Sequence, residues 1–143
     1  MRIYLDNCCY NRPFDDQTQM KIHLETQAKL HVQAQIKKGR YDLVWSYILD
    51  YENSKNPYDE KRLAIAPWRD IAAVCVLKET EDILQFAERL ALKGIKTYDA
   101  LHISCAVAAY CTYYLTTDKK LLNTPIPEIK IVSPITFVSE MEG

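Results

Sequence analysis

The chain has 143 residues, which is enough for one compact domain with a substantial core. Hydrophobic residues make up 48% and charged residues 26%, an ordinary globular balance, and no apolar run approaches the ~20 residues that a membrane span needs. The net charge of −1 gives no overall attraction to nucleic acid, so a polyanion would have to bind through local basic patches.

Short strand-like segments alternate with helical ones along the chain, which predicts a single α/β domain around a parallel sheet. Residues 2–5 predict a strand that stops at Asp6, and turn-forming residues predict a loop from there to residue 16. Residues 17–38 predict a helix, because apolar residues recur every four positions. We expect this stripe to be its buried face: Met20, Leu24, Ala28, Val32 and Ile36.

The middle of the chain predicts a second strand at residues 41–46, followed by a helix that begins near Ser46. After a break at residues 53–57, two helical segments are expected to reach about Val74. Residues 75–77 predict a short extended link.

Two further helices are expected to begin at the N-caps Thr80 and Thr97. The second runs to about Tyr110 and is apolar on nearly all sides, which predicts a buried helix. The remaining expected elements are strands at residues 113–116 and 129–132, a helical turn at 118–122 and a helix that Pro134 opens.

Several classes of enzyme lack their signature here. Only three glycines occur, far apart, so the chain has no phosphate-binding loop and no dinucleotide fingerprint. No GxSxG elbow is present, and nothing places a histidine base near Cys8 or Cys9 for cysteine catalysis. A receiver-type signalling domain needs an aspartate at the end of a central strand, but strand 41–46 ends in serine.

The five cysteines include no CxxC pair, which argues against a structural zinc site. We expect them, Cys75, Cys105 and Cys111 among them, to be small buried residues in a reducing compartment. Because the N-terminus also lacks a signal peptide, we expect a cytoplasmic protein with no membrane contact. Among the histidines, His102 is expected to be packed in the interior, with a supporting role beside Asp99, on the same helix face, as the alternative. His23 and His31 are expected at the surface.

Four acidic residues lie where strands end or helices begin: Asp6, Glu52, Asp99 and Asp118. Singly, each is explained as a strand end, a solvated helix residue or a first-turn carboxylate that favours the helix dipole. In a parallel sheet, however, the carboxyl ends of the strands meet at one edge. Four carboxylates there would repel one another, and Mg²⁺ or Mn²⁺ would relieve the repulsion. Such ions activate water against phosphodiesters, which is nuclease chemistry.

Three motifs make the chain resemble the PIN-domain family, which includes the VapC-like toxin ribonucleases of toxin–antitoxin pairs. They are IYLDN (3–7), KTYDALHISCA (96–106) and YLTTDKKLL (114–122), and IKIVSPITFV (129–138) resembles the closing strand and helix of the family. The resemblance covers essentially the whole chain. It implies a three-layer α/β/α sandwich with a central parallel sheet, which in this family is often dimeric.

The resemblance also implies roles for individual residues. Asp6, Glu52, Asp99 and Asp118 correspond to the acidic quartet that binds Mg²⁺ or Mn²⁺, and Thr116 to the hydroxyl residue that orients the site. Asn7 departs from the usual threonine or serine but keeps a polar side chain. We further expect substrate contacts from Asn7, Arg12 and Lys119.

The expected activity is therefore a metal-dependent endoribonuclease that hydrolyses RNA, with single-stranded DNA as an alternative substrate and an antitoxin protein as a partner. Basic patches that could meet the polyanion are Arg12, the Lys37, Lys38 and Arg40 cluster, Lys61 with Arg62, and Lys119 with Lys120. The alternative is a non-catalytic PIN-fold module that binds nucleic acid or protein.

Overall fold

The computed structural model describes all 143 residues, and at its centre is one five-stranded parallel sheet. The strands are β1 (Arg2–Leu5), β2 (Asp42–Ser46), β3 (Val74–Val76), β4 (Tyr113–Leu115) and β5 (Lys130–Val132). Their order in the sheet is β3-β2-β1-β4-β5, so β1 is central and the chain crosses to the other half of the sheet between β3 and β4.

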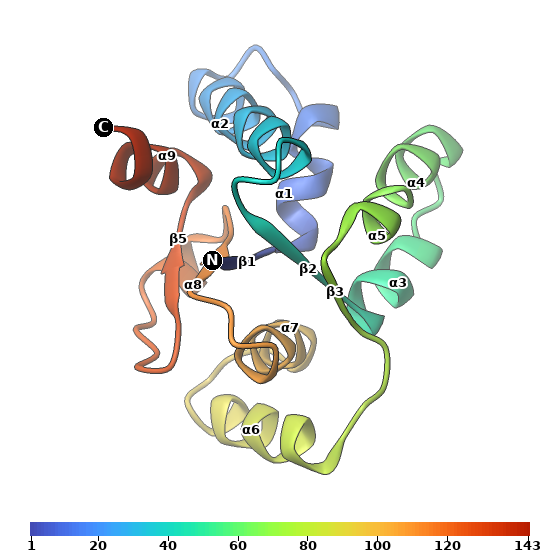
Figure 1. The fold of residues 1–143 in the computed structure, drawn as a ribbon, viewed down its shortest axis with the longest axis vertical. Coiled ribbons are helices and arrows are strands. Elements are labelled where there is room, and N and C mark those ends of the chain that lie inside the picture. Colours follow the sequence, from blue (N-terminus) through green and yellow to red (C-terminus); the bar gives the residue numbers. More distant parts are fainter.

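Helices cover both faces of this sheet and complete a three-layer α/β/α sandwich (Figure 1). α2 and α9 pack together on one face, and α6 and α7 pack together on the other. The helices are α1 (Asn7–Asn11), α2 (Met20–Lys37), α3 (Tyr47–Ser54), α4 (Asp59–Ile65), α5 (Trp68–Ile71), α6 (Glu81–Leu92), α7 (Thr97–Ala108), α8 (Lys119–Leu122) and α9 (Pro134–Glu142), and a 3₁₀ helix, η1 (Arg12–Phe14), follows α1.

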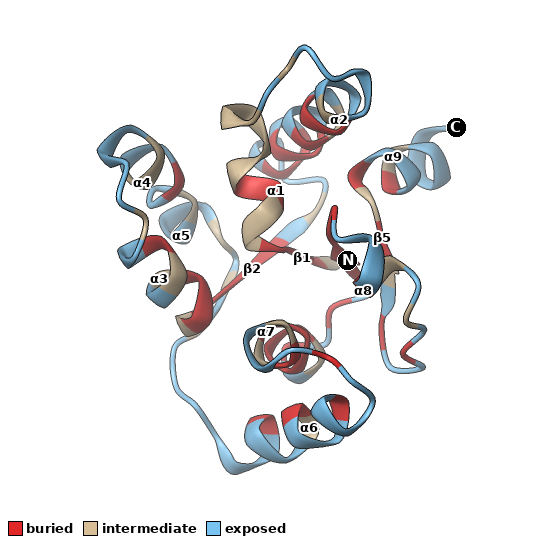
Figure 2. Cartoon of the chain, turned by 180° about the vertical axis from the view of Figure 1, so that it is seen from behind, coloured by how far each residue is buried: buried red, intermediate tan, exposed pale blue.

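The core lies along the central strands. Ile3, Tyr4 and Leu5 of β1 are fully buried, because helices cover both faces of a parallel sheet and its strands are therefore apolar without alternation. Figure 2 shows α7 largely buried between the sheet and α6, whose outer side is exposed. The expected buried character of residues 97–108 is thus confirmed. None of the helices is both long enough and apolar enough to cross a membrane.

The segment after Asp6 is helical, so the prediction of a loop was wrong there. Asp6 is the N-cap of α1, with its carboxylate accepting a hydrogen bond from the Asn7 amide at 2.7 Å. The asparagines of this segment suggested turns, but Cys9 and Tyr10 are buried and hold the turn of helix against the sheet. Tertiary packing therefore overrides the local preference.

The buried face of α2 also differs from the predicted apolar stripe. Val32 and Ile36 are buried as expected, but Met20 and Leu24 are 69% and 49% exposed. The face that meets η1 and α9 is instead largely polar and includes Glu25, Thr26, Lys29, Gln33 and Gln35.

Three smaller expectations also differ from the structure. The extended link at 75–77 is β3, an edge strand paired with β2. α7 has Lys96 as its N-cap, without a side-chain cap hydrogen bond, because Thr97 is already the first helical residue. Cys75 is exposed on the edge strand, whereas Cys9, Cys105 and Cys111 are buried as expected.

Candidate active site

The carboxyl edge of the sheet carries the predicted acidic residues. Asp6 directly follows β1, and Asp118 lies three residues beyond β4, which is paired with β1. The chain builds the sheet from β1 through β2 to β3 in one direction and continues on the other side of β1 with β4 and β5. In open parallel sheets, such a reversal of strand order leaves a crevice outside the strand ends, where ligands bind. Asp99 lies in the first turn of α7, and Glu52 lies in α3, which leaves β2 at the same edge.

Asp6 and Asp118 are linked through Thr116. The Thr116 hydroxyl donates to Asp6 Oδ2 at 2.9 Å and accepts from the Asp118 backbone N–H at 3.1 Å. Thr116 is fully buried, and the Asp6 N–H donates to the Leu115 carbonyl, which extends the β1–β4 ladder by one bond. Asp6 is therefore held rigidly at the end of the two central strands.

Asp118 and Asp99 face a common hollow of about 130 Å³ beside α8. Asp118 is exposed, and its Oδ1 accepts the N–H of Lys120 as the N-cap of α8. Two cations line the same hollow, Lys96 and Lys120. A negative group such as a phosphate would therefore meet two lysines beside the two carboxylates.

The electrostatics of Asp99 reveal how closely the acids approach one another. Burial, the charges of Asp6 and Asp118 and, more weakly, the charge of Glu52 together raise the pKa of Asp99 to about 6. The charge of His102 lowers the pKa of Asp99. Each of the other three acids is thus near enough to oppose the ionisation of Asp99.

Glu52 is held by a histidine rather than by the other acids. Its Oε1 is hydrogen bonded to His102 Nε2, and its Oε2 lies 3.5 Å from the Asn7 amide nitrogen. His102 is 1% exposed, as expected of a packed histidine, yet both ring nitrogens have partners.

A hydrogen-bond chain leads from the core to Glu52. Tyr4 Oη lies 2.6 Å from both His102 Nδ1 and Ser46 Oγ. Complete burial raises the pKa of Tyr4 well above its usual value, so its hydroxyl stays protonated. A carboxylate only accepts hydrogen bonds, so His102 Nε2 carries the proton that is directed at Glu52. His102 was noted in the sequence, but Tyr4 and Ser46 were not predicted to belong to the site. The only indication in the sequence was their position near the ends of the two strands.

These side chains match a hard divalent cation by donor type. Carboxylate, hydroxyl and amide oxygens are the ligands that Mg²⁺ and Mn²⁺ prefer, and the mutual repulsion at Asp99 is the electrostatic condition that a cation relieves. No three His, Cys, Asp or Glu side chains form a closed ligand set, because the carboxylates are turned to Thr116, His102 and the start of α8. Mg²⁺ usually keeps several waters and needs only one or two carboxylates, so an open arrangement suits it.

The thiols beside the acids are not nucleophiles. A hydrogen bond with Cys8 and complete burial raise the pKa of Cys9 well above its usual value. Cys8 Sγ lies 3.5 Å from Asp6 Oδ2 and 3.4 Å from Thr116 Oγ1, and no histidine contacts it. The expected absence of a cysteine–histidine pair agrees with this geometry.

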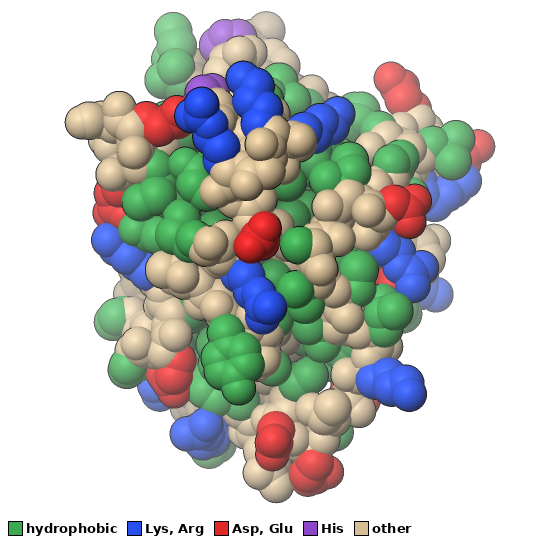
Figure 3. All heavy atoms as spheres, in the orientation of Figure 1, with side chains coloured by type: hydrophobic (Ala, Val, Ile, Leu, Met, Phe, Trp, Pro, Cys, Tyr) green, Lys and Arg blue, Asp and Glu red, His purple; other side chains and the backbone are tan.

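The two basic residues predicted to contact substrate, Arg12 and Lys119, do not line the acidic hollow. Arg12 is engaged by two acids of the protein, Asp15 at 2.9 Å and Glu25 at 3.2 Å. Lys119 is exposed but does not line the acidic hollow, whereas its neighbour Lys120 does. On the face shown in Figure 3, basic and acidic side chains are scattered rather than gathered into one basic field.

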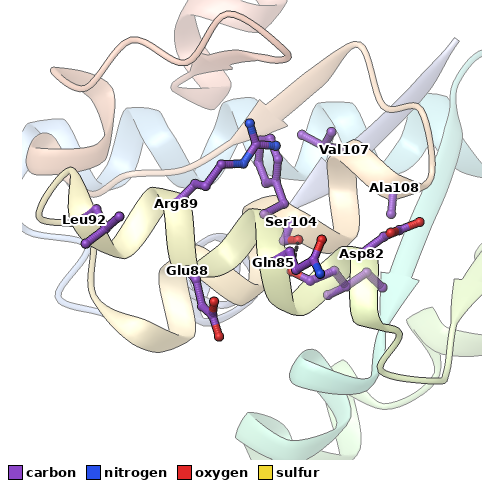
Figure 4. A pocket seen from close by; sticks show the side chains of 10 residues that line it. Asp82, Gln85, Glu88, Arg89, Leu92, Ser104, Val107 and Ala108 are labelled. Atoms are coloured by element: carbon purple, nitrogen blue, oxygen red, sulfur yellow. Dashed lines mark hydrogen bonds between the residues drawn. The ribbon is translucent and has the colours of Figure 1, made fainter.

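The largest hollow of the molecule, about 550 Å³, lies elsewhere, on the outer side of α6 and α7 (Figure 4). Glu88 and Arg89 project in different directions there, and the Ser104 hydroxyl donates to the Ile83 carbonyl at 2.6 Å. None of the four predicted acids lines this hollow, so its size does not make it the active site.

Comparison with known proteins adds no relative: no family model matches the chain, and no curated protein sequence matches it.

Proposed function

We propose that the chain is a divalent-metal-dependent endoribonuclease that hydrolyses RNA phosphodiesters, with Asp6, Glu52, Asp99 and Asp118 as ligands of Mg²⁺ or Mn²⁺. The observation that carries the proposal is the raised pKa of Asp99, to which burial and the other three acids contribute. Three carboxylates from separate parts of the chain oppose the ionisation of Asp99, which is costly to the fold without a cation.

The residues of the site would have different roles in such a reaction. Thr116 orients Asp6, and His102 and Asn7 hold Glu52. Lys96 and Lys120 attract the phosphate backbone beside Asp99 and Asp118. A divalent cation held by the carboxylates supplies the positive charge that activates water and stabilises the phosphate under attack.

The resemblance to PIN domains extends the proposal beyond the site. It favours RNA over single-stranded DNA as the substrate, an antitoxin protein as a partner, a homodimer as the assembly and the cytoplasm as the location. Such a partner would be encoded by a neighbouring gene and would co-purify with this chain.

Cleavage of mixed RNA and DNA substrates with Mn²⁺ tests the proposal. Asp99→Asn and Glu52→Gln should each abolish cleavage, as should EDTA, while Glu128→Gln, an exposed acid remote from the site, should cleave as the wild type does. Mn²⁺ titration by calorimetry on the same proteins separates metal binding from chemistry. Cleavage that persists in Asp99→Asn or in EDTA would refute the assignment, and absence of Mn²⁺ binding would favour a non-catalytic binding module.

A further inference from the structure

A third cavity, of about 200 Å³, lies among α1, η1, α2, α4 and α5, and none of the four acids lines it. Its apolar walls include Phe14, Ile65 and Trp68. Two of its polar lining residues, Lys29 and Gln33, lie one turn apart on α2. This is the helix face that sequence periodicity did not predict to be buried.

Two polar atoms around this cavity are buried without a hydrogen-bond partner, and a lysine that lines it has no ion pair. Tyr10 Oη and Gln33 Nε2 are enclosed and form no hydrogen bond. Lys29 is 5% exposed and has no carboxylate beside it, because the buried acid on the same helix face, Glu25, pairs with Arg12 instead. Its ammonium lies 5.8 Å from the centre of the Tyr10 ring. Buried polar groups are normally satisfied, and buried charges are normally paired, so these three need an explanation.

The chemistry of the three groups specifies the charge of a ligand. An ammonium and an amide nitrogen can only donate hydrogen bonds, and a phenol hydroxyl can donate as well. Two further cations lie over rings of the cavity wall, Lys37 at 5.2 Å from the Trp68 ring and Lys61 at 5.9 Å from the Phe14 ring. Donors and cations without a free acid among them favour an anion.

The size and the walls of the cavity specify the rest of the ligand. A cavity of about 150 Å³ holds one benzene ring, so this one has room for a single ring and a carboxylate. A bare inorganic anion would leave Phe14, Ile65 and Trp68 uncovered, and a neutral arene would leave Lys29 unpaired.

We propose that this cavity binds a small organic carboxylate with an apolar single-ring or branched body, whose carboxylate pairs with Lys29 and accepts hydrogen bonds from Tyr10 and Gln33. The ligand supplies the counter-charge that the fold omits, while its body packs against Phe14 and Trp68. This site does not depend on the proposed nuclease activity.

Benzoate is the probe for the test, with benzamide as its neutral analogue and acetate as the carboxylate without a ring. The protein of residues 1–143, labelled with ¹⁵N, is titrated with each at constant chloride, and the side-chain signals of Gln33 and Trp68 are followed by NMR. Benzoate should move both signals, and benzamide and acetate should each bind at least about tenfold more weakly.

Variants locate the binding. Lys29→Met should weaken benzoate binding by at least about tenfold, as expected for loss of a buried charged partner, and Gln33→Leu should weaken it less. Lys21→Met, which changes an exposed lysine on the same helix, should bind as the wild type does.

The proposal is overturned if benzamide binds as tightly as benzoate, or if Lys29→Met binds benzoate normally. A dissociation constant for benzoate weaker than about 10 mM would also overturn it. Gln33→Leu keeps the test decisive if Lys29→Met does not fold, since unchanged benzoate affinity in that variant would place the ligand elsewhere.

Discussion

Replacing Lys29 by methionine should stabilise the ligand-free fold. Burial lowers the pKa of Lys29 from 10.5 to about 8, so folding at neutral pH holds a charge in an environment that disfavours it. At about 1.4 kcal/mol per pH unit, this difference costs about 3 kcal/mol. Methionine keeps most of the apolar stem and loses only the weak attraction to the Tyr10 ring, so the net gain is about 2 kcal/mol.

The pH dependence separates this effect from ordinary repacking. Because the unfolded chain binds the Lys29 proton more tightly than the folded one, the penalty is complete below about pH 8 and disappears above about pH 10.5. Urea unfolding of the wild type and Lys29→Met at about pH 7 and about pH 9.5 should therefore show the gain fall by about half. Lys21→Met should change stability by less than about 0.5 kcal/mol at either pH.

A Lys29→Met protein that is less stable than the wild type would refute this reasoning, since it would mean that the ammonium has a partner in the fold. A stability gain that is equal at both pH values would also refute it, because the gain would then come from packing rather than from charge.

Three other substitutions test the acidic site and its support. Asp99→Asn should stabilise the protein in EDTA by about 1–2 kcal/mol at neutral pH, because the pKa of Asp99 is raised to about 6 and solvent screens part of the repulsion. The gain should vanish below about pH 4, where both states bind the proton, and a gain in urea unfolding that is equal at neutral pH and at about pH 4 would contradict this. Thr116→Val should weaken Mn²⁺ binding about 10- to 100-fold in calorimetry by releasing Asp6, whereas Thr112→Val, at an exposed threonine, should not. Tyr4→Phe should cost about 1–3 kcal/mol in urea unfolding, because it removes the partner of His102 Nδ1 and one of the partners of Ser46 Oγ. Tyr10→Phe, which removes a hydroxyl without a partner, should cost far less, and equal costs would exclude the hydrogen-bond chain.

The single α/β domain and its parallel sheet follow from features that are local in sequence. Each strand is a short apolar run with a helical segment after it, and the parallel sheet follows from that alternation. The buried face of α2 cannot be predicted in this way, because the stripe with Met20 and Leu24 and the face with Glu25 and Lys29 are adjacent on one helix. Arg12, which precedes the helix in the chain, pairs with Glu25 and so helps to determine that the Glu25 face is the buried one.

In the candidate site, too, some residues could be predicted from local sequence, while others depend on contacts between distant parts of the chain. Asp6 and Asp118 could be placed from sequence because Asp6 directly follows β1 and Asp118 lies just beyond β4, and the sheet brings strand ends together. The link from Ser46 through Tyr4 and His102 to Glu52 could not, since it joins β1, β2, α3 and α7 through side chains with no sequence spacing in common. Which carboxylate oxygen each partner holds depends on rotamers that only packing defines.

Among the buried and half-buried charged side chains of this fold, some have an ion-pair partner and others have none, and we expect the unpaired ones to bind ligands. Glu25 and Arg12 are both inward-facing ions, but they pair with each other, with Arg12 Nη2 3.2 Å from Glu25 Oε1. Asp99 and Lys29 lack such a partner, and the pKa of each is displaced toward its neutral form, Asp99 upward and Lys29 downward. Natural sequences keep locally unfavourable residues mainly where function requires them. The opposite signs then predict opposite ligands: a cation at the carboxyl edge of the sheet and a carboxylate in the cavity beside α2. Mn²⁺ and benzoate should therefore each stabilise the protein, and each stabilisation should be lost in the variant at its own site alone.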